Sequence, residues 1–255
     1  MRASLVAALV LAPLLAGTAA GSPDELVARP LVLAPGAVDL RLTAEVAVLY
    51  RRGTSLVSLA PDAWLGITDR FTLGLVHSDA SLDRIGTGGS LCVAGAARCD
   101  HVYRGSGLDL RYDAVAGTFA VAPRMRFLIR DVDPFKPAVT LGALVRWTRG
   151  RFAITCDPYV RVPLANGVLG NRASLVVPIW LAIQPAAGWL VAAHTGYDAD
   201  FAVFLEGGHG PFSVLATARA TAALELTVEA GWGQLLGPQH DAKTGTILAT
   251  VGWRR

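Results

Sequence analysis

Residues Val38–Tyr50, VDLRLTAEVAVLY, decide the fold because their side chains alternate with a period of two. The even positions are almost all apolar, and the odd positions begin with four polar residues: Asp39, Arg41, Thr43 and Glu45. A period of two is the pattern of a β-strand that has one apolar face. Thirteen residues is long for a strand of a soluble protein, whereas a tilted strand needs about 9–11 residues to cross a bilayer. The stretch therefore predicts a membrane-spanning strand.

Two segments precede this strand. Residues 1–20 have a basic residue at Arg2, an apolar run over Leu5–Leu15 and small residues up to Ala20. This pattern predicts a cleaved secretory signal peptide, and the short apolar run without a stop-transfer flank disfavours the alternative of a helical anchor. Residues 21–37 contain three prolines and cannot pair as a central strand, so we expect either a periplasmic tail or a plug inside the fold.

The chain is rich in apolar side chains, but these do not form long uninterrupted runs. The chain is 53% hydrophobic and its mean hydropathy is +0.44, which is high for a soluble protein. Leu175–Ala193 comes nearest to a spanning helix, but Pro178 and Pro185 would break it. A closed β-barrel accounts for a high apolar content without long apolar runs, because alternate residues face lipid and every backbone polar group is paired. The sequence therefore predicts an all-β fold in which residues 38–255 form one antiparallel, up-and-down transmembrane barrel.

Turn signals divide the barrel region into about twelve strands, and an even number is expected of a bacterial barrel. The predicted strands are Val38–Tyr50, Thr54–Ile67, Phe71–Ser78, Arg104–Asp113, Thr118–Arg130, Ala138–Thr148, Phe152–Val162, Ala173–Gln184, Trp189–Tyr197, Phe212–Ala220, Leu224–Gln234 and Thr246–Trp253. The connections alternate in length, and the longest is Asp79–Tyr103. Barrels of this class have short periplasmic turns and longer extracellular loops, so both termini are predicted to lie on the periplasmic side.

Aromatic residues on the apolar parity gather at two levels. Seven lie near the short turns, namely Phe71, Tyr112, Phe119, Trp147, Phe152, Trp189 and Trp253, and five lie near the longer loops, namely Tyr50, Phe127, Tyr197, Phe212 and Trp232. Amphipathic rings favour the two membrane interfaces, so these residues predict two aromatic girdles; ordinary core aromatics are the alternative. Trp64 does not fit, and a β-bulge near Pro61 would explain its parity.

The cysteines predict a disulfide in the longest loop. Cys92 and Cys99 both lie there, and an exported chain meets an oxidising compartment. The alternative is a metal site made by these cysteines with Asp100 and His101, but the spacing matches no common zinc pattern. We therefore expect no metal and no cofactor.

Charged residues on the other parity face the predicted lumen and are the candidate pore-lining residues. The arginine wall comprises Arg111, Arg124, Arg126, Arg130, Arg146 and Arg161, and the acidic wall comprises Asp39, Glu45, Asp62, Glu225 and Glu229. In a closed meander of about twelve strands the two walls stand opposite each other. Such a separation predicts a transverse field that favours anions along the arginine wall. The alternative is a salt-bridged filling that passes nothing.

Several functional classes find no support in the sequence. There is no Gly-x-Ser-x-Gly, no His-Glu-x-x-His and no glycine-rich phosphate loop, so the chain is not expected to be an enzyme. An outer-membrane hydrolase would have to use His77 with Asp79, or His240 with Asp241, which are more simply solvated loop residues. The net charge is only +3, and no basic run with interleaved aromatics indicates a nucleic-acid partner.

The chain as a whole resembles bacterial outer-membrane barrels of about twelve strands. More narrowly, SLAPDAWLGITDRFTLGLVHS (Ser58–Ser78) and TGYDADF (Thr195–Phe201) resemble segments of the transporter-like family linked by name to the meta-pathway of phenol degradation. That resemblance implies uptake of small organic compounds. Barrels of this type usually end on an aromatic residue that the barrel assembly machinery reads, whereas here Arg254 and Arg255 follow Trp253.

The function predicted from the sequence is that of a monomeric outer-membrane channel. Its expected partners are outer-membrane lipid, small solutes that pass passively, and the barrel assembly machinery. The alternative is a closed structural barrel whose extracellular loops, especially Asp79–Tyr103, bind a partner.

Overall fold

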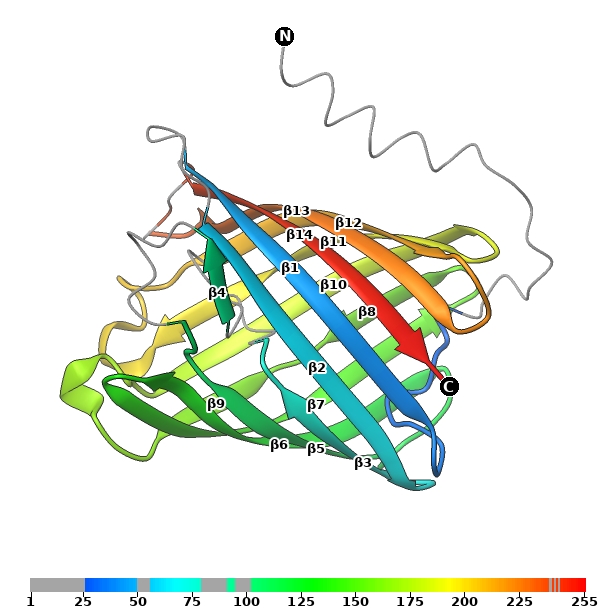
Figure 1. The fold of residues 1–255 in the computed structure, drawn as a ribbon, viewed down its shortest axis with the longest axis horizontal. Coiled ribbons are helices and arrows are strands. Elements are labelled where there is room, and N and C mark those ends of the chain that lie inside the picture. Colours follow the sequence, from blue (N-terminus) through cyan, green and yellow to red (C-terminus); the bar gives the residue numbers. More distant parts are fainter. Residues whose placement is uncertain are drawn as a thin grey trace, which may run out of the picture.

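The strands of the computed structural model form one closed antiparallel barrel (Figure 1). The structure describes residues 26–49, 56–78, 91–94, 102–238, 240, 242 and 244–255. The barrel closes where β1 (Val38–Leu49) pairs with β14 (Thr244–Arg254), the blue and red strands that lie side by side in Figure 1. On its other edge β1 pairs with β2 (Leu56–Thr68). The predicted closed fold is therefore confirmed.

The barrel wall has twelve positions, as predicted, and two of them are each filled by two short strands. β3 (Phe71–Val76) and β4 (Leu91–Ala94) pair with the same edge of β2. β8 (Phe152–Cys156) and β9 (Tyr159–Pro163) both lie between β7 and β10. The other strands are β5 (Ser106–Tyr112), β6 (Phe119–Val132), β7 (Phe135–Arg149), β10 (Ser174–Ala186), β11 (Trp189–Asp200), β12 (Gly210–Arg219) and β13 (Leu224–Leu236).

The interruption between β8 and β9 has a local cause. Pro158 has no backbone N–H, so it cannot continue the ladder of hydrogen bonds there. The amide of Asp157 instead donates to the carbonyl of Pro178 at 3.1 Å, and the amide of Ala143 donates to the carbonyl of Pro158 at 3.1 Å. The break leaves the Asp157 side chain buried inside the barrel.

One predicted loop is wrong. Residues 131–137 were expected to form a loop because they contain two prolines, but β6 and β7 extend into this region and leave only Asp133–Pro134 between them. Pro137 pairs with Ile129 beside a register shift, where the regular ladder is already interrupted. A proline at such a bulge costs no regular hydrogen bond, so it does not end the strand.

The connections between strands include two short 3-10 helices, Gly167–Leu169 and Phe201–Val203. Within the described part of the chain, no helix is long and apolar enough to cross a membrane.

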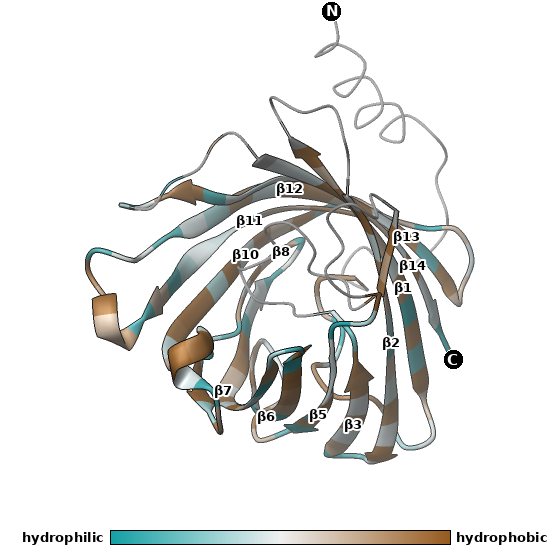
Figure 2. Cartoon of the chain, turned by 60° about the vertical axis from the view of Figure 1, so that its left-hand side comes forward, coloured by the Kyte–Doolittle hydropathy of each residue, from teal (hydrophilic) through white to brown (hydrophobic). Residues whose placement is uncertain are grey.

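The barrel is apolar outside and polar inside. Leu42 and Leu141 on the outer face are 47% and 52% exposed, whereas Asp109 and Arg126 on the inner face are 0% and 2% exposed. Figure 2 shows this alternation as brown and teal bands along the strands. A soluble protein buries its apolar face, so the reversed arrangement fits a barrel whose outer surface contacts lipid.

The described girdle aromatics all lie on the outward parity of their strands. Phe71 is opposite Tyr112, and Phe119 is opposite Trp147, in both cases beside a short turn. Towards the other ends of their strands, Phe212 is opposite Trp232. Tyr50 lies outside the described residues.

Trp64 points inward, and the bulge predicted near Pro61 is wrong. The β1–β2 register runs without a shift from Ala47 opposite Leu56 to Val38 opposite Leu65. The indole lies over Gly74, where a Cβ atom would be 2.3 Å from the ring. A glycine on the next strand therefore makes room for the ring inside the barrel.

Candidate functional site in the barrel lumen

A cavity of about 450 Å³ lies inside the barrel. Its charged lining includes three residues of the arginine wall and three of the acidic wall, namely Arg111, Arg124, Arg146, Asp39, Asp62 and Glu229. The rings of Trp64 and Trp180 line the same space, as do four residues before β1, namely Arg29, Pro30, Leu31 and Leu33. A volume of this size is within the range of small-molecule sites. We call this space the lumen cavity.

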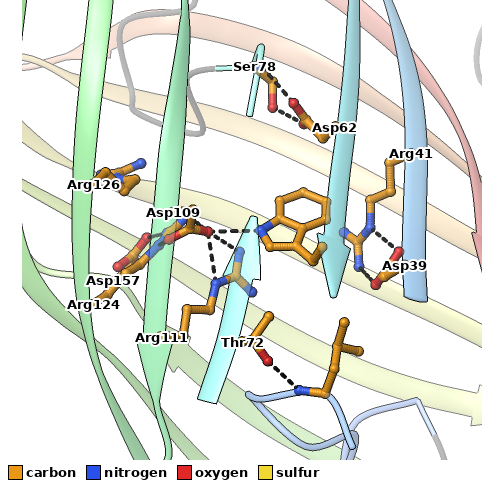
Figure 3. Close-up of polar contacts among 12 residues, drawn as sticks. Asp39, Arg41, Asp62, Thr72, Ser78, Asp109, Arg111, Arg124, Arg126 and Asp157 are labelled. Atoms are coloured by element: carbon orange, nitrogen blue, oxygen red, sulfur yellow. Dashed lines mark hydrogen bonds and ion pairs between the residues drawn. The ribbon is translucent and has the colours of Figure 1, made fainter. Parts of the chain in front are cut away.

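The carboxylate of Asp109 on β5 is the centre of a buried polar network (Figure 3). It accepts hydrogen bonds from Arg111 Nη2 at 2.6 Å and from Arg124 Nε at 2.7 Å. The indole Nε1 of Trp64 donates to the same carboxylate at 2.9 Å. Arg124 also donates through Nη1 to Asp157, which the break after β8 places in the interior. Two guanidinium groups and two carboxylates thus form one group, Asp109, Arg111, Arg124 and Asp157, which we call the buried quartet.

The charges of the buried quartet cancel within it. Buried ions are tolerated when they are paired and hydrogen-bonded, and removing one partner leaves another charge uncompensated. For Arg111 and Arg124 the structure therefore matches the salt-bridged filling that the sequence left open as an alternative. These two arginines contribute little net field to the lumen.

Trp64 connects the two walls. Its ring lies between the guanidinium of Arg41, 5.5 Å from the ring centroid, and that of Arg111, 5.1 Å from it. Cation–π contacts of this kind hold a ring in one orientation. Because β2 carries the tryptophan and β1 and β5 carry the arginines, the contact links side chains across four neighbouring wall positions, those of β1, β2, β3 and β5.

The remaining members of the arginine wall also lie on the inward parity. Arg126 donates from Nε to Thr140 Oγ1 at 2.9 Å, and its guanidinium lies 4.3 Å from the ring centroid of Tyr159. Arg130 donates to Asn171 Oδ1 at 3.3 Å. Arg161 is buried and lies 3.9 Å from a carboxylate oxygen of Asp200.

Arg146 on β7 differs from these residues in its partners. Its Nη1 donates to the carbonyl of Arg29, and its Nη2 donates to the carbonyl of Ala28 at 3.5 Å. Among the described residues it forms no salt bridge with a carboxylate. It is the member of the arginine wall that lines the lumen cavity with an uncompensated charge.

Arginines neutralise the acidic wall in part. Strand parity predicts Arg41 on this wall, whereas Arg29, Arg219 and Arg254 were not predicted there. Asp39 accepts from Arg41 Nη2 at 3.0 Å and from Arg254 Nη2 at 2.6 Å. Glu225 binds Arg29 and, at 3.3 Å, Arg219. Strand parity could have placed Arg254 inside, because its neighbour Trp253 faces outward.

Other acidic residues of this wall bind uncharged or histidine partners. Glu229 accepts a hydrogen bond from Ser213 and lies 3.2 Å from Nδ1 of His194. Asp62 accepts from the amides of His77 and Ser78 at 2.6 and 3.0 Å. Glu45 is also buried on the inward parity. The acidic wall thus lies on β1, β2 and β13 and the arginine wall on β5, β6, β7 and β9, and each wall also contains charges of the other sign.

Residues before β1 contact inward side chains of four strands. The amides of Leu26 and Val27 donate to Gln184 Oε1 on β10 at 2.9 and 3.2 Å, and Arg29 reaches Glu225 on β13. Arg146 on β7 donates hydrogen bonds to the carbonyls of Ala28 and Arg29.

Further along the segment, the amide of Leu33 donates to Thr72 Oγ1 on β3 at 2.8 Å. The amide of Gly36 donates to the carbonyl of Gly66 on β2 at 2.8 Å. Four apolar side chains of the segment are buried, namely Leu26, Val27, Val32 and Leu33.

The longest connection lies mostly outside the described residues. Cys92 is in β4, and Cys99 falls outside the described residues, so the predicted disulfide stays a prediction. Asp79 and Asp241 of the considered His/Asp pairs also lie outside them. Among the residues that are described, no group of three His, Cys, Asp or Glu side chains could hold a metal ion.

Comparison with known proteins supports the fold. No protein-family model matches the chain, and no curated protein matches it. Among solved structures, the chain is similar to the NanC porin (TM-score 0.61, 6% identity, 84% of this chain and 98% of that chain). It is also similar to an outer membrane channel from Pseudomonas putida F1 (TM-score 0.56, 14% identity, 88% and 97%). A third similar structure is the KdgM porin in complex with disordered oligogalacturonate (TM-score 0.54, 8% identity, 85% and 98%). At these identities the likeness shows a shared barrel fold, and the resemblance to the phenol meta-pathway family stays a prediction.

Proposed function

We propose that this chain is an outer-membrane channel for the passive passage of small solutes, with a narrow lumen that favours anions at the arginine wall. The observation that carries the proposal is the lumen cavity, a polar space inside a barrel whose outer face is apolar. The porin and channel names of the similar structures support the same reading.

The anion preference rests on Arg146. The buried quartet is internally neutral, whereas Arg146 contacts only carbonyl oxygens among the described residues. A fixed cation in a narrow, partly dehydrated space raises the local concentration of anions more than a paired one does.

Residues 21–37 act in this proposal as a plug that narrows the periplasmic end of the lumen. The contacts of residues 26–36 with Gln184, Glu225, Arg146 and Thr72 support a plug over a free periplasmic tail. These hydrogen bonds anchor the segment, and its side chains Leu26, Val27, Val32 and Leu33 are buried, so the plug narrows the path.

A closed structural barrel is the second candidate, and the buried quartet favours it. Salt bridges within β5, between β5 and β6, and from β6 to Asp157 just after β8 fill interior space that a channel would leave to water. In that case the extracellular loops would carry the function, as the sequence analysis allowed for Asp79–Tyr103.

Liposome swelling separates the two candidates. The chain from residue 21 onward is refolded into liposomes, which are then diluted into solutions of arabinose, glycine or the trisaccharide raffinose. A narrow channel admits the two small solutes and excludes raffinose. Swelling no faster than that of protein-free liposomes for every solute would contradict the channel and favour the closed barrel.

A further inference from the structure

Two buried side chains of opposite charge face the lumen cavity with one unpartnered polar atom each. Arg146 is 7% exposed and Asp157 is 2% exposed, and both line the cavity. Within the described part of the chain, Arg146 Nε donates no hydrogen bond and Asp157 Oδ1 accepts none. Buried polar atoms are normally hydrogen-bonded, so two such atoms in one cavity indicate a ligand.

The two side chains do not satisfy each other because each is held elsewhere. The two Nη atoms of Arg146 are directed to the carbonyls of Ala28 and Arg29, and Asp157 Oδ2 accepts from Arg124. Arg146 is opposite Thr155 in the β7–β8 pairing, and Asp157 is the next residue along the chain on the same parity as Thr155. The donor and the acceptor therefore lie at neighbouring inward positions.

We propose that the lumen cavity binds a small zwitterionic solute of the α-amino-acid class, with its carboxylate at Arg146 and its ammonium group at Asp157. Such a solute supplies an acceptor to Nε and a donor to Oδ1, and its opposite charges sit one carbon atom apart. It satisfies both atoms at once, whereas an anion alone would leave Asp157 Oδ1 without a donor and a cation alone would leave Arg146 Nε without an acceptor. The inference rests on the proposed function, because the solute must reach the lumen.

The rest of the cavity favours an apolar side chain on this solute. Leu144 is the inward neighbour of Arg146 on β7, and Leu215 lines the cavity from β12. Trp180 is opposite Thr155, which is opposite Arg146, so a guanidinium, a small side chain and an indole lie in one row across three strands. The other side of the indole is stacked on His194, with ring centroids 4.6 Å apart, which keeps its ring in place as an apolar surface.

Binding to the detergent-refolded chain tests the inference with three probes of similar shape. L-leucine carries both charges, isocaproate lacks the ammonium group, and isoamylamine lacks the carboxylate. We expect saturable binding of leucine in isothermal titration calorimetry, and about tenfold or more weaker binding of each analogue, because each loses one charge-assisted hydrogen bond. Equal affinity for leucine and isocaproate, or no saturable binding of leucine, would overturn the proposal.

Substitutions at the two positions should change the affinities in opposite ways. Arg146→Gln should weaken leucine and isocaproate about tenfold or more, whereas Asp157→Asn should weaken leucine and strengthen isocaproate. The gain for isocaproate shows that the Asp157→Asn chain is folded. Arg149→Gln, at the end of the same strand but on the outward parity, should leave leucine binding unchanged. Unchanged leucine affinity in Arg146→Gln would overturn the assignment.

This test is independent of solute flux. A chain that swells liposomes but does not bind leucine keeps the proposed function and loses the zwitterion site. A chain that binds leucine but admits no solute keeps the site and loses the channel.

Discussion

At the scale of single residues, the lumen arginines differ in whether their charge is compensated. Arg111 and Arg124 belong to the buried quartet, whereas Arg146 is held by two carbonyl groups of the segment before β1. The two kinds of arginine predict different mutant phenotypes. Loss of a quartet member affects stability first, and loss of Arg146 affects selectivity first.

Substituting Asp109 should destabilise the barrel. Asp109→Asn leaves Arg111 and Arg124 with one carboxylate fewer in a buried site, so we expect a loss of about 3–5 kcal/mol in the free energy of unfolding. Urea unfolding in lipid vesicles, followed by tryptophan fluorescence, measures this loss. Asp131→Asn is the matched control, because its partly exposed pair with Lys136 at 3.6 Å should contribute less than about 1 kcal/mol. Equal losses in the two variants would contradict the role given to Asp109.

Substituting Arg146 should change ion selectivity with little loss of stability. Arg146→Gln removes the uncompensated cation of the lumen cavity, so the reversal potential under a KCl gradient should shift towards cation preference. Arg149→Gln, outside the lumen on the same strand, should not shift it. Arg124→Gln is a poorer probe, because it also frees Asp109 and Asp157 from their partner. A reversal potential that is unchanged in Arg146→Gln would remove this residue from the selectivity mechanism.

Strand parity predicted which charged residues face inward, but it could not predict how they pair. All eleven candidate pore-lining residues lie on the inward parity of their strands. Their partners depend on the register between strands, and a single sequence carries no signal for that register. Arg124 on β6, for example, reaches Asp157, which follows β8 and so lies beyond β7, the strand next to β6.

At the scale of elements, the sequence predicted most strands because each lipid-facing strand must alternate and each turn needs turn residues. Both errors in the predicted strands involve proline. The prolines of residues 131–137 suggested a loop, but β6 and β7 extend through this region to a tight turn at Asp133–Pro134. Asp157–Pro158 was expected inside a continuous strand that is in fact split. Proline removes one backbone hydrogen-bond donor, and whether this loss ends a strand depends on the hydrogen bonds that the neighbouring residues form with the next strand.

Removing the segment before β1 should enlarge the conducting path. Deletion of residues 21–36 eliminates the Arg29–Glu225 pair and the carbonyl contacts of Arg146. We therefore expect a larger single-channel conductance and a stronger influence of the Glu225 charge on which ions pass. Deletion of residues 21–25 alone is the control, since it retains every contact described for the segment. Identical conductance of the two deletions would contradict the plug.

At the scale of the whole molecule, the fold follows from the solvent on its outer face. On nearly every strand, apolar residues such as leucine and phenylalanine point outward, and they alternate with residues such as arginine and aspartate that point inward. The β1–β14 pairing closes the sheet. In lipid only a closed barrel or a helix pairs all of its backbone groups. The interior then gathers the charged side chains of the described strands, and these leave a cavity of about 450 Å³.

Single-channel recording in planar bilayers tests the central claim, that this interior is a path for small solutes. We expect small, discrete conductance steps for the chain from residue 21 onward, with a reversal potential that indicates anion preference. An absence of conductance at every voltage, both with residues 21–37 and without them, would contradict it.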